Sequence, residues 1–195
     1  ESFGKIQKIR NADARLKIAN AIAMGKPDRV FVNDGSPEDH RKLVEMALAN
    51  REEEKLAIKD HYIHFDLPEE QGRIVDRTLY VVNEGESVSS LARKILRADA
   101  FKYVQDVMVG MMKGMTLVIG FYSRGPIGAY ASIPAIEATT SAYVCHSGEL
   151  LYRNCFEQFD AEAERVGHFF TNVHCQGPNR PEDLPNARVL MDRSW

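Results

Sequence analysis

Cysteine is scarce in this sequence, and long apolar runs are missing. The 195 residues include only three cysteines, Cys145, Cys155 and Cys175. An odd and sparse set argues against a disulfide framework and favours a reducing cytoplasm. No apolar run is long enough to span a bilayer, and residues 1–5 lack the pattern of a signal peptide. We therefore expect a cytoplasmic protein with no membrane partner.

Basic clusters are missing as well. The chain carries 25 Lys and Arg against 28 Asp and Glu, a formal net charge of -3. No run of Lys and Arg could neutralise a row of phosphates, so we expect no nucleic-acid partner. The densest charged run, Arg-Glu-Glu-Glu-Lys at residues 51–55, is typical of a solvated helix end or loop.

The first part of the chain predicts an α/β unit. Its length and 44% hydrophobic content suit one domain, or one lobe of a larger protein. Apolar spacing predicts a helix over residues 5–24, and residues 29–33 read as a short strand. Asp34 and Gly35 form a turn, after which Ser36 caps a helix with Pro37 at its first position. Acidic residues at that helix start would repel phosphate.

The remainder alternates between strands and helices. We expect helices near 88–97, 99–113 and 156–166, and strands at 78–83, 116–122, 169–174 and 188–192. The nearly continuous apolar run at 116–122 suits a central strand covered on both faces. Residues 142–145 read as a short strand or buried turn, 123–133 as a loop and 177–185 as a surface connection. The stripe of Phe101, Val104, Met108 and Met111 predicts core packing, with Gly114 as the helix cap.

Motifs for catalysis and metal binding are few. The chain contains no phosphate loop of the G-x-x-x-x-G-K-[ST] type, no G-x-G-x-x-G and no G-x-S-x-G. His61 and His64 are three residues apart without an acidic helix motif between them. The pairs Cys145-His146 and His174-Cys175 could form a Cys/His site only if they met in space. Buried thiols and hydrogen-bonded imidazoles are the simpler interpretation.

Two places remain of interest. Arg73 and Arg77 would share one face of an extended segment at the start of a strand. Arginine holds carboxylates in a bidentate way, but a surface pair in salt bridges is the alternative. The glycines of residues 123–128 could let the backbone approach a ligand, or could form an ordinary turn.

Several runs of the chain resemble one known family. The stretches are residues 72–78, 112–128 (Met-Lys-Gly-Met-Thr-Leu-Val-Ile-Gly-Phe-Tyr-Ser-Arg-Gly-Pro-Ile-Gly), 136–144 and 170–177. Their order and spacing are similar to the amino-terminal region of GTP-dependent phosphoenolpyruvate carboxykinases, from a divergent branch. The resemblance implies an α/β fold with a mixed sheet flanked by helices. It divides the chain into an N-terminal helix (1–27), the family-like α/β domain (28–177) and a connection (178–195) to a missing carboxy-terminal lobe.

The resemblance also implies a reaction. The family converts oxaloacetate and GTP to phosphoenolpyruvate and carbon dioxide, a step of gluconeogenesis, with Mn²⁺ at the active site and Mg²⁺ on the nucleotide. Arg73 matches the family arginine that contacts the substrate carboxylate, whereas Arg77 receives no catalytic role. Arg124 departs from an apolar family position, so the phosphoryl donor stays open between GTP, ATP and pyrophosphate.

The isolated chain is expected to lack part of this machinery. The family's metal ligands, phosphate loop and lid lie beyond the matched region. We therefore expect the 195-residue chain to be inactive alone and to bind neither cofactor. Its partners would be oxaloacetate or phosphoenolpyruvate and the nucleotide-binding lobe. The alternative is a stand-alone, non-catalytic domain that binds a small dicarboxylate or a protein.

Overall fold

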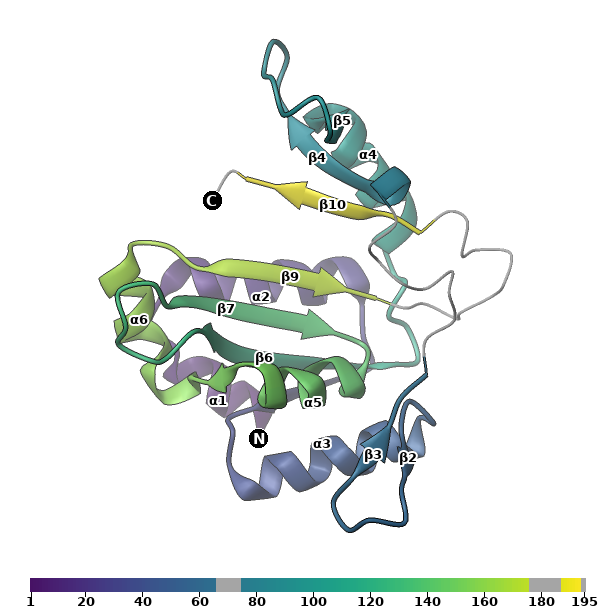
Figure 1. The fold of residues 1–195 in the computed structure, drawn as a ribbon, viewed down its shortest axis with the longest axis vertical. Coiled ribbons are helices and arrows are strands. Elements are labelled where there is room, and N and C mark those ends of the chain that lie inside the picture. The colour runs from purple at the N-terminus through teal and green to yellow at the C-terminus, as the bar shows by residue number, and fades with distance from the viewer. Residues whose placement is uncertain (66–74, 176–186, 194–195) are drawn as a thin grey trace. The chain divides into compact units, whose positions relative to one another are not determined.

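The computed structural model describes residues 1–65, 75–175 and 187–193. These residues belong to two compact units. The first unit comprises Glu1–His64 with Gly110–Gly177, and the second comprises Phe65–Val109 with Pro178–Trp195. Each unit has its own sheet, drawn in Figure 1. The sequence-based division at 27/28 and 177/178 stays a prediction.

A five-stranded mixed sheet forms the centre of the first unit. Its main order is β1-β6-β7-β9, and β8 pairs with β6 beyond the end of β1. β6 runs parallel to β1 and antiparallel to β7, and β9 runs parallel to β7. The strands are β1 (Arg29–Asn33), β6 (Thr116–Arg124), β7 (Ile133–Thr139), β8 (Arg153–Asn154) and β9 (Phe170–His174). The mixed α/β fold and the buried central strand are therefore confirmed.

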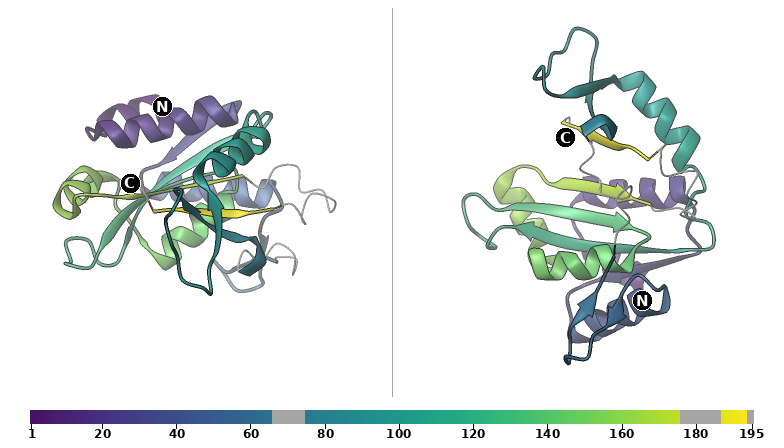
Figure 2. Two further views of the ribbon diagram at one scale, coloured as in Figure 1. Left: turned by 90° about the horizontal axis from the view of Figure 1, so that it is seen from above. Right: turned by 45° about the vertical axis from the view of Figure 1, so that its right-hand side comes forward.

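Helices cover both faces of this sheet. Figure 2 shows the purple helices of the N-terminus on one side and the green helix α5 on the other. Successive side chains of β6 point to opposite faces of the sheet. Phe121 packs edge-to-face on Phe156 and Phe159, whereas Val118 and Tyr122 join the cluster of α3 and α5. The helices are α1 (Ser2–Lys8), α2 (Ala12–Gly25), α3 (Pro37–Ala49), α5 (Ala142–Leu151) and α6 (Phe159–Val166).

The N-terminal helix predicted over 5–24 is two helices. Asn11 caps α2, because its side-chain oxygen accepts from the Ala14 amide at 3.0 Å. The carboxylate of Asp160 accepts from the backbone amides of Arg10 and Asn11 at 2.8 and 2.9 Å. The break between α1 and α2 is therefore stabilised by a residue 149 positions away, a contact that local periodicity does not report.

α1 closes the outer edge of β1. The Ser2 hydroxyl accepts from the Val32 amide, and the Lys5 ammonium donates to the Val32 carbonyl oxygen, both at 3.3 Å. Lys5 also pairs with Asp34 at 3.0 Å and with Asp39. Although partial burial opposes it, hydrogen bonds to these carboxylates raise the pKa of Lys5. An edge strand whose backbone groups are satisfied in this way is protected from pairing with another chain.

Tyr122 fixes α5 against the sheet. A Cβ added at Gly120 would lie 2.4 Å from the Tyr122 ring, so the ring occupies the space above Gly120. A Cβ at Gly148 of α5 would lie 3.1 Å from the same ring. The Tyr122 hydroxyl donates to the Cys145 carbonyl oxygen at 2.8 Å. Burial raises the pKa of Tyr122 well above its ordinary value, so the phenol keeps the proton that it donates.

Two segments of the first unit differ from the sequence-based prediction. Residues 133–139 form the strand β7, which was not predicted. Residues 142–145 were predicted as a short strand or buried turn, but they open α5. Ser141 caps this helix by accepting from the Val144 amide at 3.3 Å, so a capping residue decided the conformation.

The second unit contains a parallel sheet of three strands in the order β10-β4-β5, with α4 beside it. The elements are η2 (Val75–Arg77), β4 (Thr78–Val82), β5 (Arg93–Leu96), α4 (Arg97–Met108) and β10 (Val189–Asp192). The strands expected near 78–83 and 188–192 are confirmed. The helix predicted at 88–97 is wrong, because residues 93–96 pair with β4 instead.

The core stripe predicted over residues 101–111 is wrong at Phe101, which is 57% exposed. Val104, Met108 and Met111 are half-buried, and Ala100 is the buried residue of α4. The helix ends at Met108, before Gly110, whose φ of 74° is left-handed. Gly114 therefore lies in the turn that follows and does not cap the helix. Among the residues that the structure describes, none of the helices could cross a membrane.

Gly120→Ala tests the packing of Tyr122. We expect the free energy of unfolding, measured in urea, to fall by roughly 2 kcal/mol because the Tyr122 ring must leave its position. Gly4→Ala is the control, since its Cβ would meet no atom within 4 Å. If both variants unfold like the parent chain, the ring does not depend on Gly120.

Candidate functional site

Arg73 lies outside the described residues. Its expected contact with a substrate carboxylate therefore stays a prediction. Arg77 ends η2, immediately before β4, and it has interaction partners in the structure. Upstream of Arg73 along the chain lies a short antiparallel ribbon, β2 (Glu54–Lys55) and β3 (Tyr62–Ile63).

The residues before this ribbon cap α5. Glu52 Oε2 accepts from the Ser141 hydroxyl and from the Tyr143 amide, both at 2.7 Å. A carboxylate at the first turn of a helix satisfies free N–H groups and favours the positive end of the dipole. His64 stacks on Tyr143 with ring centres 3.5 Å apart, and its Nδ1 lies 2.5 Å from the Glu52 carbonyl oxygen. The ribbon end is therefore fixed to the start of α5.

A buried acid–histidine pair makes a second connection. Nδ1 of His146 lies 2.8 and 2.9 Å from the two carboxylate oxygens of Glu53. The side chains of His146 and Glu53 are only 6% and 5% exposed. The prediction that residues 51–55 are a solvated run is wrong at this position. Because a buried carboxylate needs a partner, Glu53 holds the ribbon against α5.

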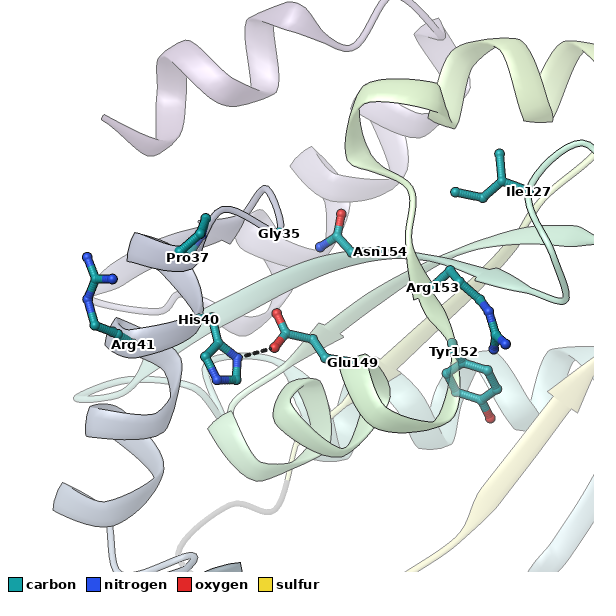
Figure 3. Close-up of a pocket in the computed structure, with 9 residues that line it drawn as sticks. All are labelled: Gly35, Pro37, His40, Arg41, Ile127, Glu149, Tyr152, Arg153 and Asn154. Carbon is teal, nitrogen blue, oxygen red and sulfur yellow. Dashed lines mark hydrogen bonds and ion pairs between the residues drawn. The ribbon is translucent and has the colours of Figure 1, made fainter. Parts of the chain in front are cut away.

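An open cavity of about 670 Å³ lies beside this connection. Its walls come from the β1–α3 turn, the first turn of α3, the end of α5, β8 and the β6–β7 loop. The lining residues, drawn in Figure 3, are Gly35, Pro37, His40, Arg41, Ile127, Glu149, Tyr152, Arg153 and Asn154.

The central pair of the cavity is His40 and Glu149. His40 Nδ1 lies 2.6 Å from Glu149 Oε2, and the buried Asn33 amide donates to Glu149 Oε1 at 2.7 Å. Gly35 supplies the turn that shapes this wall, with φ at 80°, and a Cβ there would lie 2.6 Å from the Asn154 side chain. The predicted Asp34–Gly35 turn and the Ser36 cap are confirmed.

Glu162 accepts hydrogen bonds from the glycine-rich loop between β6 and β7. Its Oε1 accepts from the Gly128 amide at 3.1 Å, and its Oε2 accepts from the Ser132 hydroxyl at 3.0 Å. Hydrogen bonds from Arg165, with those from Gly128 and Ser132, lower the pKa of Glu162 to about 2 against the opposing effect of burial. Of the two interpretations left open for residues 123–128, these contacts favour a structural turn.

Arg124 stands at the end of β6 beside two rings. Its guanidinium carbon lies 5.4 Å from the Tyr152 ring centre and 5.5 Å from that of Phe170. On the same face, burial raises the pKa of Glu137, although the Asn172 amide donates to it at 2.8 Å. Cation–π contacts with these two rings thus accommodate the Arg124 guanidinium at the end of the strand.

The Cys/His pairs have separate partners. Cys145 and His146 lie on α5, whereas His174 Nδ1 lies 2.9 Å from the Thr139 hydroxyl. Burial lowers the pKa of His174 and raises that of Cys155 to about 12. All three cysteines are free thiols. Within the described ranges, no group of three His, Cys, Asp or Glu side chains could hold a metal ion.

Neither the contacts of Glu52 and Glu53 with α5 nor the cavity were predicted from the sequence. The signal available was the triplet Glu52-Glu53-Glu54, together with His40 and His146. Only the second of these glutamates is buried, and the histidine–glutamate pairs join residues that are 93 and 109 positions apart. Spacing along the chain could not reveal them.

Comparison with known proteins assigns the chain to a family. The sequence model described as "Phosphoenolpyruvate carboxykinase N-terminal domain" matches residues 17–194. The chain is similar to phosphoenolpyruvate carboxykinase (GTP) of Thermococcus kodakarensis, 34% identical over 196 residues, and of Pyrococcus horikoshii, 35% identical over 199. The alignments cover 98% of this chain and 31% of each relative. The protein of the same name from Saccharolobus solfataricus is 29% identical over 192 residues, which cover 98% of this chain and 30% of that relative. The chain thus spans less than a third of the length of these relatives.

Glu53→Ala tests the buried pair. We expect the free energy of unfolding to fall by about 3 kcal/mol, because His146 is left buried without its partner. Glu54→Ala, one residue along on an exposed side chain, should change it by less than about 0.5 kcal/mol. Equal effects in urea unfolding would show that Glu53 does not hold the ribbon.

Glu162→Gln tests the loop attachment through pH. The pKa of Glu162 is lowered on folding, so its carboxylate contributes stability above the ordinary pKa, and this contribution is lost as pH falls toward about 2. The stability difference between the parent and Glu162→Gln should therefore shrink on acidification. The exposed neighbour Glu164→Gln should show a small, constant difference. A Glu162→Gln difference that does not vary with pH would contradict the attachment.

Proposed function

The chain belongs to the phosphoenolpyruvate carboxykinase N-terminal domain family, and from this membership we propose that it is the substrate-side part of a GTP-dependent phosphoenolpyruvate carboxykinase. The observation that carries the proposal is the match over residues 17–194, which spans both structural units. The proposed reaction converts oxaloacetate and GTP to phosphoenolpyruvate, carbon dioxide and GDP. We place this reaction in gluconeogenesis. We also place it in the cytoplasm, because the chain has only three cysteines.

Arg73 is the residue proposed to contact the substrate. Its guanidinium would hold a carboxylate of oxaloacetate through two parallel hydrogen bonds and stabilise the negative charge that develops as carbon dioxide leaves. His64, which stacks on Tyr143 of α5, lies nine residues before Arg73 in the sequence. β4 begins at Thr78, five residues after Arg73. The resemblance of residues 72–78 to the family's stretch supports this role.

The metal and nucleotide are assigned to the remainder of the protein. The described residues do not fit a Mn²⁺ site, because they contain no suitable cluster of ligands. The acidic start of α3, where Asp34 and Asp39 surround Lys5, is likewise a poor place for a nucleotide phosphate. The proposed contribution of this chain is therefore substrate binding and orientation.

Arg73→Lys tests the substrate contact in the complete gene product that contains this chain. Lysine keeps the charge but loses the bidentate geometry. We expect kcat/KM for oxaloacetate, with GTP as donor, to fall roughly 10- to 100-fold. Arg77→Lys is the matched control and should stay within about threefold of the parent. If both variants behave alike, Arg73 has no special role.

A second experiment distinguishes the proposed enzyme from the alternative, a stand-alone binding domain. The purified 195-residue chain should form no phosphoenolpyruvate with GTP, ATP or pyrophosphate. Activity of this chain alone would contradict the proposed division of labour. If the complete gene product is also inactive with all three donors but binds malonate in an Arg73-dependent way, the binding-domain alternative replaces the enzyme.

A further inference from the structure

The parallel sheet of the second unit, β10-β4-β5, has α4 on one of its faces. Residues that pair in register point to the same side of a sheet, so Asp192, Val81 and Ile95 share a face. The Arg97 guanidinium, in the first turn of α4, donates to the two carboxylate oxygens of Asp192 at 2.6 and 2.9 Å. Figure 1 shows this helix against β4 and β5. α4 therefore covers the face that carries Asp192.

The opposite face of this sheet carries apolar side chains that remain exposed. By the same register, the apolar residues on it are Tyr80, Val82, Leu96, Val189 and Met191. Val82 is buried, but Leu96 and Met191 are each 42% exposed, and Val189 is 40% exposed. The described part of this unit contains one α-helix, α4, so no second helix of the unit covers this face.

An exposed apolar face is unusual for a parallel sheet. Parallel sheets are almost always covered on both faces, and their strands are apolar for that reason. Among the described residues of this unit, the buried apolar side chains are Val81, Val82 and Ala100. So small a core does not offset the conformational entropy of ordering three strands and a helix. We therefore expect a further segment to cover the second face.

The length of the relatives indicates which segment this is. The chain covers 31% of the Thermococcus kodakarensis protein, and the family match is to an N-terminal domain. In such a protein, the larger part follows the matched region. Parallel strands are joined by crossover connections, which are usually helices packed on a face of the sheet. Because α4 occupies one face, a helix that follows β10 can pack on the face of Met191.

We propose that the face of Leu96, Val189 and Met191 is the docking surface for an amphipathic helix from the part of the protein that follows residue 195. The apolar stripe of this helix would pack on these three side chains. Exposed Lys94 lies in the same row as Tyr80 and Met191, so an acidic residue of the helix would face it. The inference rests on the proposed function, because it takes the chain to be one part of a complete carboxykinase.

Photocrosslinking in the complete gene product identifies what covers this face. The photoreactive residue p-benzoylphenylalanine is placed at position 96, and in the control at position 102. Lys102 is 77% exposed and pairs with Asp106 along the polar side of α4. Irradiation should join position 96 to a peptide from beyond residue 195 of the same molecule, and this product should be lost at position 102. Crosslinks from position 96 within residues 1–195, crosslinks between two molecules, or none at all would each overturn the proposal.

Oxidative footprinting of the unsubstituted gene product is a second readout that no substitution can disturb. Met112 is fully buried and serves as the internal reference. If a helix covers the face, hydroxyl radicals should modify Met191 as slowly as Met112, each relative to the urea-unfolded protein. A rate at Met191 in keeping with its 42% exposure would contradict the docking. Carboxykinase activity is measured on the same sample. Activity with an unprotected Met191 contradicts the surface alone, whereas an inactive protein with Met191 protected and the expected crosslink contradicts the proposed function alone.

Discussion

The packing of the Tyr122 ring between Gly120 and Gly148 is the contact on which the first unit depends. The ring fills space that any other residue at position 120 would need, and the small residue at 148 lets α5 approach. The hydroxyl completes the contact through the Cys145 carbonyl oxygen. A buried ring that is also hydrogen-bonded fixes both the distance and the rotation of the helix on the sheet.

The position of α5 on the sheet determines which contacts its other residues make. Its first turn receives Glu52, its middle presents His146 to Glu53, and its last turn places Glu149 in the cavity. One helix thus connects the ribbon of β2 and β3 with the wall of the cavity.

The sequence predicted the elements whose signals are local. The apolar run of β6, the Ser36 cap and the strand β1 follow from periodicity and capping, and the family resemblance followed from ordered motifs. The errors have long-range causes. Asp160 stabilises the break between α1 and α2, β4 draws residues 93–96 into a strand, and Glu53 is buried by His146. The spacing of residues along the chain could not predict the cavity, because its walls come from segments more than 100 residues apart.

The role proposed for this chain is that of the substrate-side part of a carboxykinase. The most direct measurement is the product balance of the complete gene product supplied with oxaloacetate and GTP. If the proposed role is right, phosphoenolpyruvate, carbon dioxide and GDP form in equal amounts. Carbon dioxide with pyruvate and no GDP, or no turnover with any phosphoryl donor, would contradict it.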